Sequence, residues 1–115
     1  MISVVILTYD SGRTIEACLD SLAAQTPPPS EVLLVDDDSS DDTVAKARAA
    51  AQRAGLVLRV VRNGSHNISH GRNIGLGAAQ GPVVAFLDSD AVEPGWIKAI
   101  LETFDADPDI AVVGG

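Results

Sequence analysis

The 115-residue sequence has little cysteine, few aromatic residues and few basic residues, and each shortage excludes a class of protein. The single Cys18 can form neither a disulfide within the chain nor a multi-cysteine zinc site. Eight Lys and Arg against sixteen Asp and Glu give a formal net charge of -8. Broad binding to DNA or RNA is thereby excluded, because it requires a basic face. The apolar runs are far shorter than the ~20 residues that span a bilayer.

The first residues also lack the markers of export. They have no basic start and reach Thr8 and Asp10 at once, so no signal peptide is predicted. We therefore expect a cytoplasmic protein, with a place at the inner face of the membrane if the full-length protein is longer. Hydrophobic residues at 46% and charged residues at 21% are typical of one globular domain over residues 1–115.

The sequence does contain short aliphatic and β-branched runs that alternate with helical patterns. Continuous runs of this kind are typical of strands buried on both faces of a parallel sheet. They occupy residues 2–7, 31–35, 56–61, 83–87 and 110–113. Because strands and helices alternate, we predict an α/β fold: a Rossmann-like, mostly parallel open sheet with helices on both faces. A chain that ends after a strand suggests one part of a larger sheet.

The helices are predicted from apolar spacing and from end signals. The first opens at Ser11 and Gly12, and three prolines at 27–29 end it. The second is Ala-rich, with Ser39, Ser40 or Asp41 as its N-cap and Gly55 at its end. The third covers 71–79, where two glycines, 75 and 77, weaken the helix but allow close backbone packing. The fourth covers roughly 94–104.

Polar residues follow three of the predicted strands. In an open α/β sheet, ligands bind outside the carboxyl ends of the strands. The residues at these positions are Thr8, Tyr9 and Asp10 after the first strand, Asp36, Asp37 and Asp38 after the second, and Asp88 and Asp90 after the fourth. We expect them to line one site.

Several of these residues are carboxylates, which repel each other when they are close. A hard divalent cation relieves the repulsion, and Mg²⁺ commonly takes one or two carboxylates together with phosphate oxygens. Asp88 and Asp90 form an Asp-x-Asp motif that suits this role, although such a pair can also simply cap a turn. Asp41 and Asp42 are better explained as favourable charge at a helix N-terminus.

The remaining candidates suit a planar, phosphate-bearing ligand. Asp36 and Asp37 can accept hydrogen bonds from a base or a ribose. Tyr9 can stack on a base, or it can be an ordinary half-buried edge residue. Arg72 offers the planar fork of donors that phosphate or a base carbonyl accepts, and a structural salt bridge is the alternative.

Four motifs in order resemble family 2 glycosyltransferases of the GT-A fold. Residues 4–10 (VVILTYD) resemble the family's VVIPTYN strand, and residues 35–43 (VDDDSSDDT) resemble its VDDGSSDDT. Residues 71–75 (GRNIG), followed by residues 79–81 (AQG), resemble ARNxG…A.G, and residues 86–90 (FLDSD) match its FLDSD. Together the four motifs cover nearly the whole chain.

The resemblance implies a role for each matching position. It would place Tyr9 against the base and Asp37 on the imide N–H of a uracil-type base, with Asp36 supporting that loop. Arg72 would contact the base or a phosphate. Asp90 would bind Mg²⁺ or Mn²⁺ at the diphosphate, while Asp88 would contact the ribose or bind the metal through a water.

The implied reaction is transfer, with inversion, of a sugar from a nucleoside diphosphate to an acceptor hydroxyl. A UDP-sugar is the favoured donor and a GDP-sugar the alternative; the acceptor is unknown. Three positions depart from the pattern: Leu7 replaces a proline, Asp10 an asparagine, and Asp38 a small residue, often glycine. The family's catalytic base lies in a later half, so no catalytic residue is named here.

Two other classes of function stay open at this point. A non-catalytic module could assemble with another chain or with itself through the exposed last strand. A phosphotransfer domain could also use Asp88 and Asp90. In haloacid dehalogenases, however, the corresponding acidic pair follows the first strand, whereas Asp88 and Asp90 follow the fourth predicted strand. Receiver domains likewise require an acidic pair after the first strand and a later Lys, which this sequence does not show.

Overall fold

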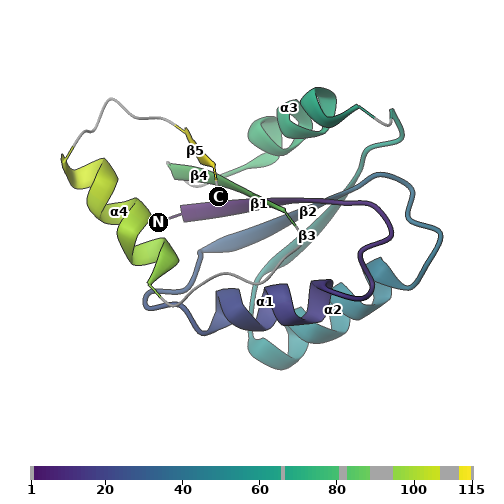
Figure 1. Ribbon diagram of the computed structural model, residues 1–115, viewed down its shortest axis with the longest axis horizontal. Coiled ribbons are helices and arrows are strands. Elements are labelled where there is room, and N and C mark those ends of the chain that lie inside the picture. Colours follow the sequence, from purple (N-terminus) through teal and green to yellow (C-terminus); the bar gives the residue numbers. More distant parts are fainter. Residues whose placement is uncertain (1, 66, 81–82, 89–94, 107–111, 115) are drawn as a thin grey trace.

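The computed structural model describes residues 2–65, 67–80, 83–88, 95–106 and 112–114. Strands and helices alternate along the chain (Figure 1). The elements are β1 (Ile2–Thr8), α1 (Ile15–Ala23), β2 (Glu31–Asp36), α2 (Thr43–Ala54), β3 (Leu58–Arg62), α3 (Ile68–Ala78), β4 (Val83–Asp88), α4 (Trp96–Ala106) and β5 (Val112–Gly114).

The strands form one sheet in the order β3-β2-β1-β4-β5, and every neighbouring pair is parallel. The predicted α/β architecture is therefore confirmed. The register places Thr8, Asp36 and Arg62 in one row across β1, β2 and β3. On the other side of β1, Asp88 of β4 pairs with Leu7. Three strands that the sequence analysis selected thus end side by side at one edge of the sheet.

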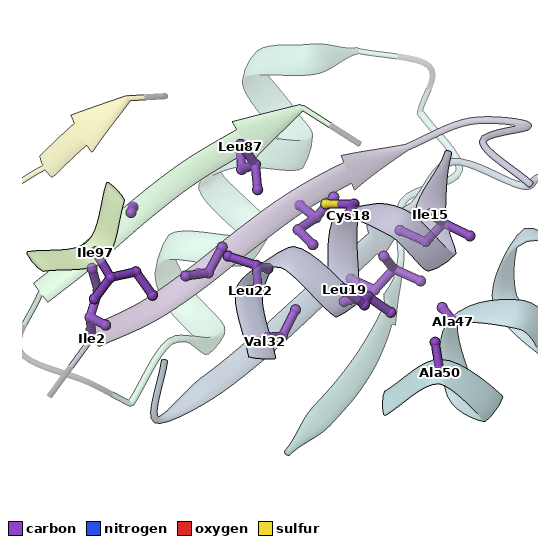
Figure 2. Close-up of a cluster of buried hydrophobic side chains, with 14 of the residues drawn as sticks. Ile2, Ile15, Cys18, Leu19, Leu22, Val32, Ala47, Ala50, Leu87 and Ile97 are labelled. Atoms are coloured by element: carbon purple, nitrogen blue, oxygen red, sulfur yellow. The ribbon is translucent and has the colours of Figure 1, made fainter. Parts of the chain in front are cut away.

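One face of the sheet carries the larger core. The apolar stripe of α1 supplies Ile15, Cys18, Leu19 and Leu22, all fully buried. Figure 2 shows these side chains packed over β1 and β2, with Ala47 and Ala50 of α2 and Ile97 of α4 in the same cluster. Cys18 is buried and free, as its position on the helix predicts. This face anchors the helices that follow the site loops.

The opposite face is covered by α3 (Figure 1). Here Gly75 lies directly on β1: a Cβ added to it would meet Val5 Cγ1 at 2.4 Å. The predicted close packing is confirmed for Gly75. It is wrong for Gly77, since nothing lies within 4 Å of its Cβ position. The helix can approach β1 because one of the two glycines faces the sheet.

Several element ends differ from the predictions, each for a local reason. Helix α1 begins at Ile15, because 11–14 form a preceding turn. Helix α3 begins three residues earlier than predicted, because the Asn67 side chain accepts the His70 N–H and caps it. Strand β3 begins at Leu58, since Gly55 in the left-handed region (φ 74°) and the following residues still close α2.

At the amino ends of the strands, a buried carboxylate, Glu31, joins neighbouring elements by hydrogen bonds. Glu31, at the start of β2, accepts from the Ser3 hydroxyl and from the Gln80 N–H, both at 2.6 Å. Arg59 of β3 donates to the same carboxylate at 2.9 Å and also to the Ala78 carbonyl. Burial would raise the pKa of Glu31, but these hydrogen bonds and the Arg59 charge outweigh it and lower that pKa.

None of the helices within the described ranges combines the length and the apolar character that a bilayer crossing requires.

Candidate functional site

At the carboxyl ends of β1 and β2, two loops lie side by side (Figure 1). Their centre is Asp36, which is buried. Its Oδ1 accepts from the Thr8 hydroxyl at 2.8 Å and from the Ser39 hydroxyl at 2.5 Å, and its Oδ2 accepts from the Ser39 N–H at 2.9 Å. Both Thr8 and Asp36 are thus engaged within the protein, where they fix the start of each loop.

Hydrogen bonds from Asp10 extend this connection. Asp10 has a positive φ of 48°, and its N–H donates to the Ser39 hydroxyl at 2.9 Å. Its carboxylate accepts from the N–H of Ser40 at 2.7 Å and of Asp41 at 3.3 Å. The side chain that departs from asparagine in the motif therefore ties one loop to the other.

Asp41 makes the next link. Its carboxylate accepts from the Thr43 hydroxyl, from the Thr43 N–H at 3.0 Å and from the Gly12 N–H at 3.1 Å. The Thr43 hydroxyl bond is the main cause of a lowered Asp41 pKa, and the two N–H donors add to it against a smaller effect of burial. Lys46 closes the group by donating to the Gly12 carbonyl at 3.1 Å.

The predicted cap of α2 needs a correction. Asp42, rather than Ser39, Ser40 or Asp41, stands at the N-cap position, and it makes no side-chain cap hydrogen bond. The first helical N–H, that of Thr43, is satisfied by Asp41 instead. Ser40 instead donates its N–H across to Asp10 of the other loop. The Ser39 hydroxyl accepts from the Asp10 N–H and donates to Asp36 of its own loop.

The clamp is the set of hydrogen bonds that joins the loop after β1 to the loop after β2, from the Thr8–Asp36 bond to the Lys46–Gly12 bond. Two candidate ligand-binding residues lie on this clamped loop pair. Asp37 is half-buried, and its N–H donates to the Thr8 carbonyl at 2.9 Å, continuing the sheet by one bond. Tyr9 is 59% exposed, whereas most large hydrophobic side chains of the described residues are buried. The acid and the ring are the predicted base-binding pair, and both sit immediately beyond the strand ends.

The third member of the acidic run faces β3. Asp38 has a positive φ of 55°, and its Oδ1 accepts from Arg62 Nε at 2.7 Å. That hydrogen bond and the Asp38 charge raise the pKa of Arg62. Sequence analysis did not single out Arg62. Its place directly after the third predicted strand was the available signal.

Asn63 was also missed. It is buried, its N–H donates to the Asp36 carbonyl at 2.8 Å, and its Oδ1 accepts from the Ser65 hydroxyl at 2.7 Å. A Cβ on Gly71 would lie 2.8 Å from the Asn63 amide nitrogen, so the start of α3 rests closely on this turn. Asn63 therefore links the β2 loop to the helix that carries Arg72.

Arg72 is an exposed residue of α3, and its side chain reaches β4 of the sheet. Its guanidinium carbon is 5.9 Å from the centre of the Phe86 ring of β4, a cation–π arrangement. The predicted alternative, a salt bridge, is not among the ion pairs of the described residues. Arg72 and Asp88 thus belong to neighbouring parts of the molecule, α3 and the β4 that it covers.

The Asp-x-Asp motif is described only in part. The backbone of Asp88 ends β4 beside Leu7, at the same edge as the two loops. Its side chain and the whole of Asp90 lie outside the described residues. Across the side chains that the structure does describe, no group of three or more His, Cys, Asp or Glu could hold a metal ion.

The sequence and the fold were compared with those of known proteins. The family described as glycosyl transferase family 2 matches residues 3–115. A curated relative, the glucosyl-dolichyl phosphate glucuronosyltransferase of Haloferax volcanii, is 40% identical over 52 residues, which cover 44% of this chain and 17% of the relative.

Solved structures agree over nearly the whole chain. S. aureus TarS 1-349 in complex with UDP-GlcNAc is 32% identical, with a TM-score of 0.79 over 91% of this chain and 31% of that one. The Pyrobaculum calidifontis mannosyltransferase PcManGT, in complex with GDP-Man and Mn²⁺, is 29% identical, with a TM-score of 0.83 over 95% of this chain and 33% of that one.

The chain therefore spans about a third of the length of these structural relatives and less of the curated one. The motifs that resembled the family, the parallel sheet that presents them and the match over residues 3–115 agree. This chain belongs to glycosyl transferase family 2.

Proposed function

We propose that this chain binds the nucleoside-diphosphate part of a sugar donor, as a portion of an inverting glycosyltransferase. A UDP-sugar is the favoured donor and a GDP-sugar the alternative. The observation that carries the proposal is the clamped loop pair, which holds Asp37 and Tyr9 at the sheet edge where β4 delivers Asp88. The complexes of TarS with UDP-GlcNAc and of PcManGT with GDP-Man support it.

Each residue then has a distinct role. Asp37 accepts from the imide N–H of the base, and the exposed Tyr9 ring lies against the base plane. Thr8, Asp36 and Asp10 act from within, because their side chains hold the two loops together. Arg72, held over Phe86, reaches toward the base or the diphosphate.

A divalent cation fits the donor set at the end of β4. Asp88 and Asp90 offer carboxylate oxygens, the hard ligands that Mg²⁺ and Mn²⁺ prefer, and the loop edge beside them is rich in further acids. Asp90 would bind the metal, and Asp88 would bind it directly or through water. The metal would stabilise the charge that develops on the leaving diphosphate. The protein's own contribution here is to hold the nucleotide beside that position.

Calorimetric titration with UDP and with GDP, each with and without Mn²⁺, tests the proposal. We expect one of them to bind, and to bind more tightly with Mn²⁺. In the variant Asp37→Asn the affinity should fall by about tenfold or more, because a hydrogen bond to a charged acceptor is lost. Asp20→Asn on α1 is the matched control, since Asp20 pairs with Arg53 away from the loops.

A folded sample that binds neither nucleotide would contradict the proposal. Equal affinities for the wild type and Asp37→Asn would contradict the role of Asp37 alone. Assembly through β5, which lies at one outer edge of the sheet, is a separate prediction that light scattering tests.

A further inference from the structure

An ion pair joins the β2 loop to β3 directly beside Asp37. Arg62 Nε donates to Asp38 Oδ1 at 2.7 Å, with the Arg62 side chain 80% exposed and that of Asp38 37% exposed. Arg62 is the last residue of β3 and lies in register with Asp36. Its guanidinium therefore stands at the same sheet edge as the proposed nucleotide site.

Asp38 occupies a position that needs support. Its φ of 55° is in the left-handed region, which side chains other than glycine adopt less readily. Its other carboxylate oxygen faces the loop after β3, where a Cβ on Gly64 would lie 3.3 Å from Oδ2. The carboxylate is thus placed between Arg62 and the Gly64 backbone.

Asp37 lies between two anchored neighbours. On one side, Asp36 is fixed by three hydrogen bonds from Thr8 and Ser39. On the other side, the described contacts of the Asp38 side chain run to β3 through Arg62. Without Arg62, the Asp38 carboxylate would be an uncompensated like charge next to Asp37 and next to an anionic ligand.

We propose that Arg62 is a positioning residue for nucleotide recognition. Through Asp38 it fixes the backbone that carries Asp37, and it neutralises the charge that would otherwise weaken binding of a nucleoside diphosphate. This inference rests on the proposed function. Arg62 acts through Asp38, so its effect disappears when Asp38 is replaced by a residue that needs neither the tether nor the neutralisation.

Titration of UDP in the presence of Mn²⁺ into four proteins tests this: the wild type, Arg62→Ala, Asp38→Gly and the double variant. We expect Arg62→Ala to lower UDP affinity by about fivefold or more, as coupled neighbours do. Asp38→Gly should bind nearly as the wild type does, because glycine adopts a positive φ at no steric cost. In the Asp38→Gly background, Arg62→Ala should change affinity by less than about twofold.

Arg53→Ala is the matched control. Arg53 of α2 is also an exposed arginine paired with an aspartate, Asp20 of α1, at 3.1 Å, and this pair lies away from the site loops. The Arg53→Ala variant removes the same charge as Arg62→Ala but away from the site, so its UDP affinity should equal that of the wild type. Thermal unfolding of every variant accompanies the titrations, and similar midpoints for Arg62→Ala and Arg53→Ala are expected.

Three results would overturn the inference while leaving the proposed function intact. The first is that Arg62→Ala binds UDP as tightly as the wild type. The second is that the affinity loss in Arg62→Ala persists in the Asp38→Gly background, which would mean that Arg62 contacts the nucleotide directly. A large loss in Asp38→Gly alone would assign the contact to Asp38 itself. Failure of the wild type to bind either nucleotide would instead overturn the proposed function and this inference with it.

Discussion

The two ends of β2 carry buried carboxylates that are satisfied in different ways. At the amino end, Glu31 meets a cation, Arg59, in addition to a hydroxyl and an N–H. At the carboxyl end, Asp36 accepts from two hydroxyls and one N–H, all neutral. The amino end, where Arg59 neutralises the charge of Glu31, is the closed end, and its role is structural. At the carboxyl end no cation of the described residues is bonded to Asp36, and further acids stand beside it, an arrangement that suits a cation or a polar ligand.

The largest expected effect concerns the closed end, which depends on α3 lying close to the sheet. In Gly75→Ala the new methyl would meet the fully buried Val5 at 2.4 Å and push α3 outward. We expect the free energy of unfolding to fall by about 1–3 kcal/mol, the usual cost of overpacking a core. Urea denaturation measures it.

Gly77→Ala is the control for this change, since its Cβ position is open. It should stabilise the protein by about 0.5 kcal/mol, because alanine favours a helix. If Gly75→Ala were equally neutral, α3 would not hold the closed end in the way described.

Isosteric amides at the two ends test the contrast directly. Glu31→Gln should cost about 2 kcal/mol, because Arg59 and the Gln80 N–H can only donate and one amide group cannot accept from both sides. Asp36→Asn should cost about 1 kcal/mol or less, because the hydroxyls of Thr8 and Ser39 can turn and accept. Chemical denaturation gives both values, and the reverse order would break the comparison.

The smallest expected effect is on the pH dependence of stability. The folded-state pKa of Glu31 lies below its usual 4.5. Its contribution is therefore complete above pH 4.5 and is lost as the pH falls through the folded-state pKa. The stability difference between the wild type and Glu31→Gln should shrink as the pH falls from 5 to about 3.

Some acid sensitivity should remain in Glu31→Gln, because Asp41 also has a lowered pKa, with a usual value of 3.8. Denaturation midpoints of both proteins, measured as a function of pH, check this. A difference that stayed constant down to pH 3 would show that the closed end does not depend on ionised Glu31.

The sequence was a good guide where one physical signal dominates. Continuous apolar runs identified β1 and β2, because a strand covered on both faces has no room for polar residues. The rule that ligands bind at the carboxyl ends of strands brought Thr8, Asp36 and Asp88 to one edge, and the register confirms that placement. Family resemblance assigned the fold and the likeness to glycosyltransferases.

Prediction failed where several acceptors compete for the same donors. Ser39 and Asp41 are residue types that cap helices, but their partners lie 29 residues away or nearby in the same loop, and sequence spacing does not rank these choices. Arg62 and Asn63 were missed for a different reason. Their importance comes from the register of β3 against β2, which only the assembled sheet defines.

The clamp between the two loops is made of residues no later than Lys46 in the chain. Its bonds close two successive β–α units, whereas β4 joins the other side of β1 later in the sequence. A ribosome that has released the first β–α–β–α segment has therefore already supplied every group of the clamp. Substitutions beyond that segment can alter what the site binds without supplying or removing any donor or acceptor of the clamp.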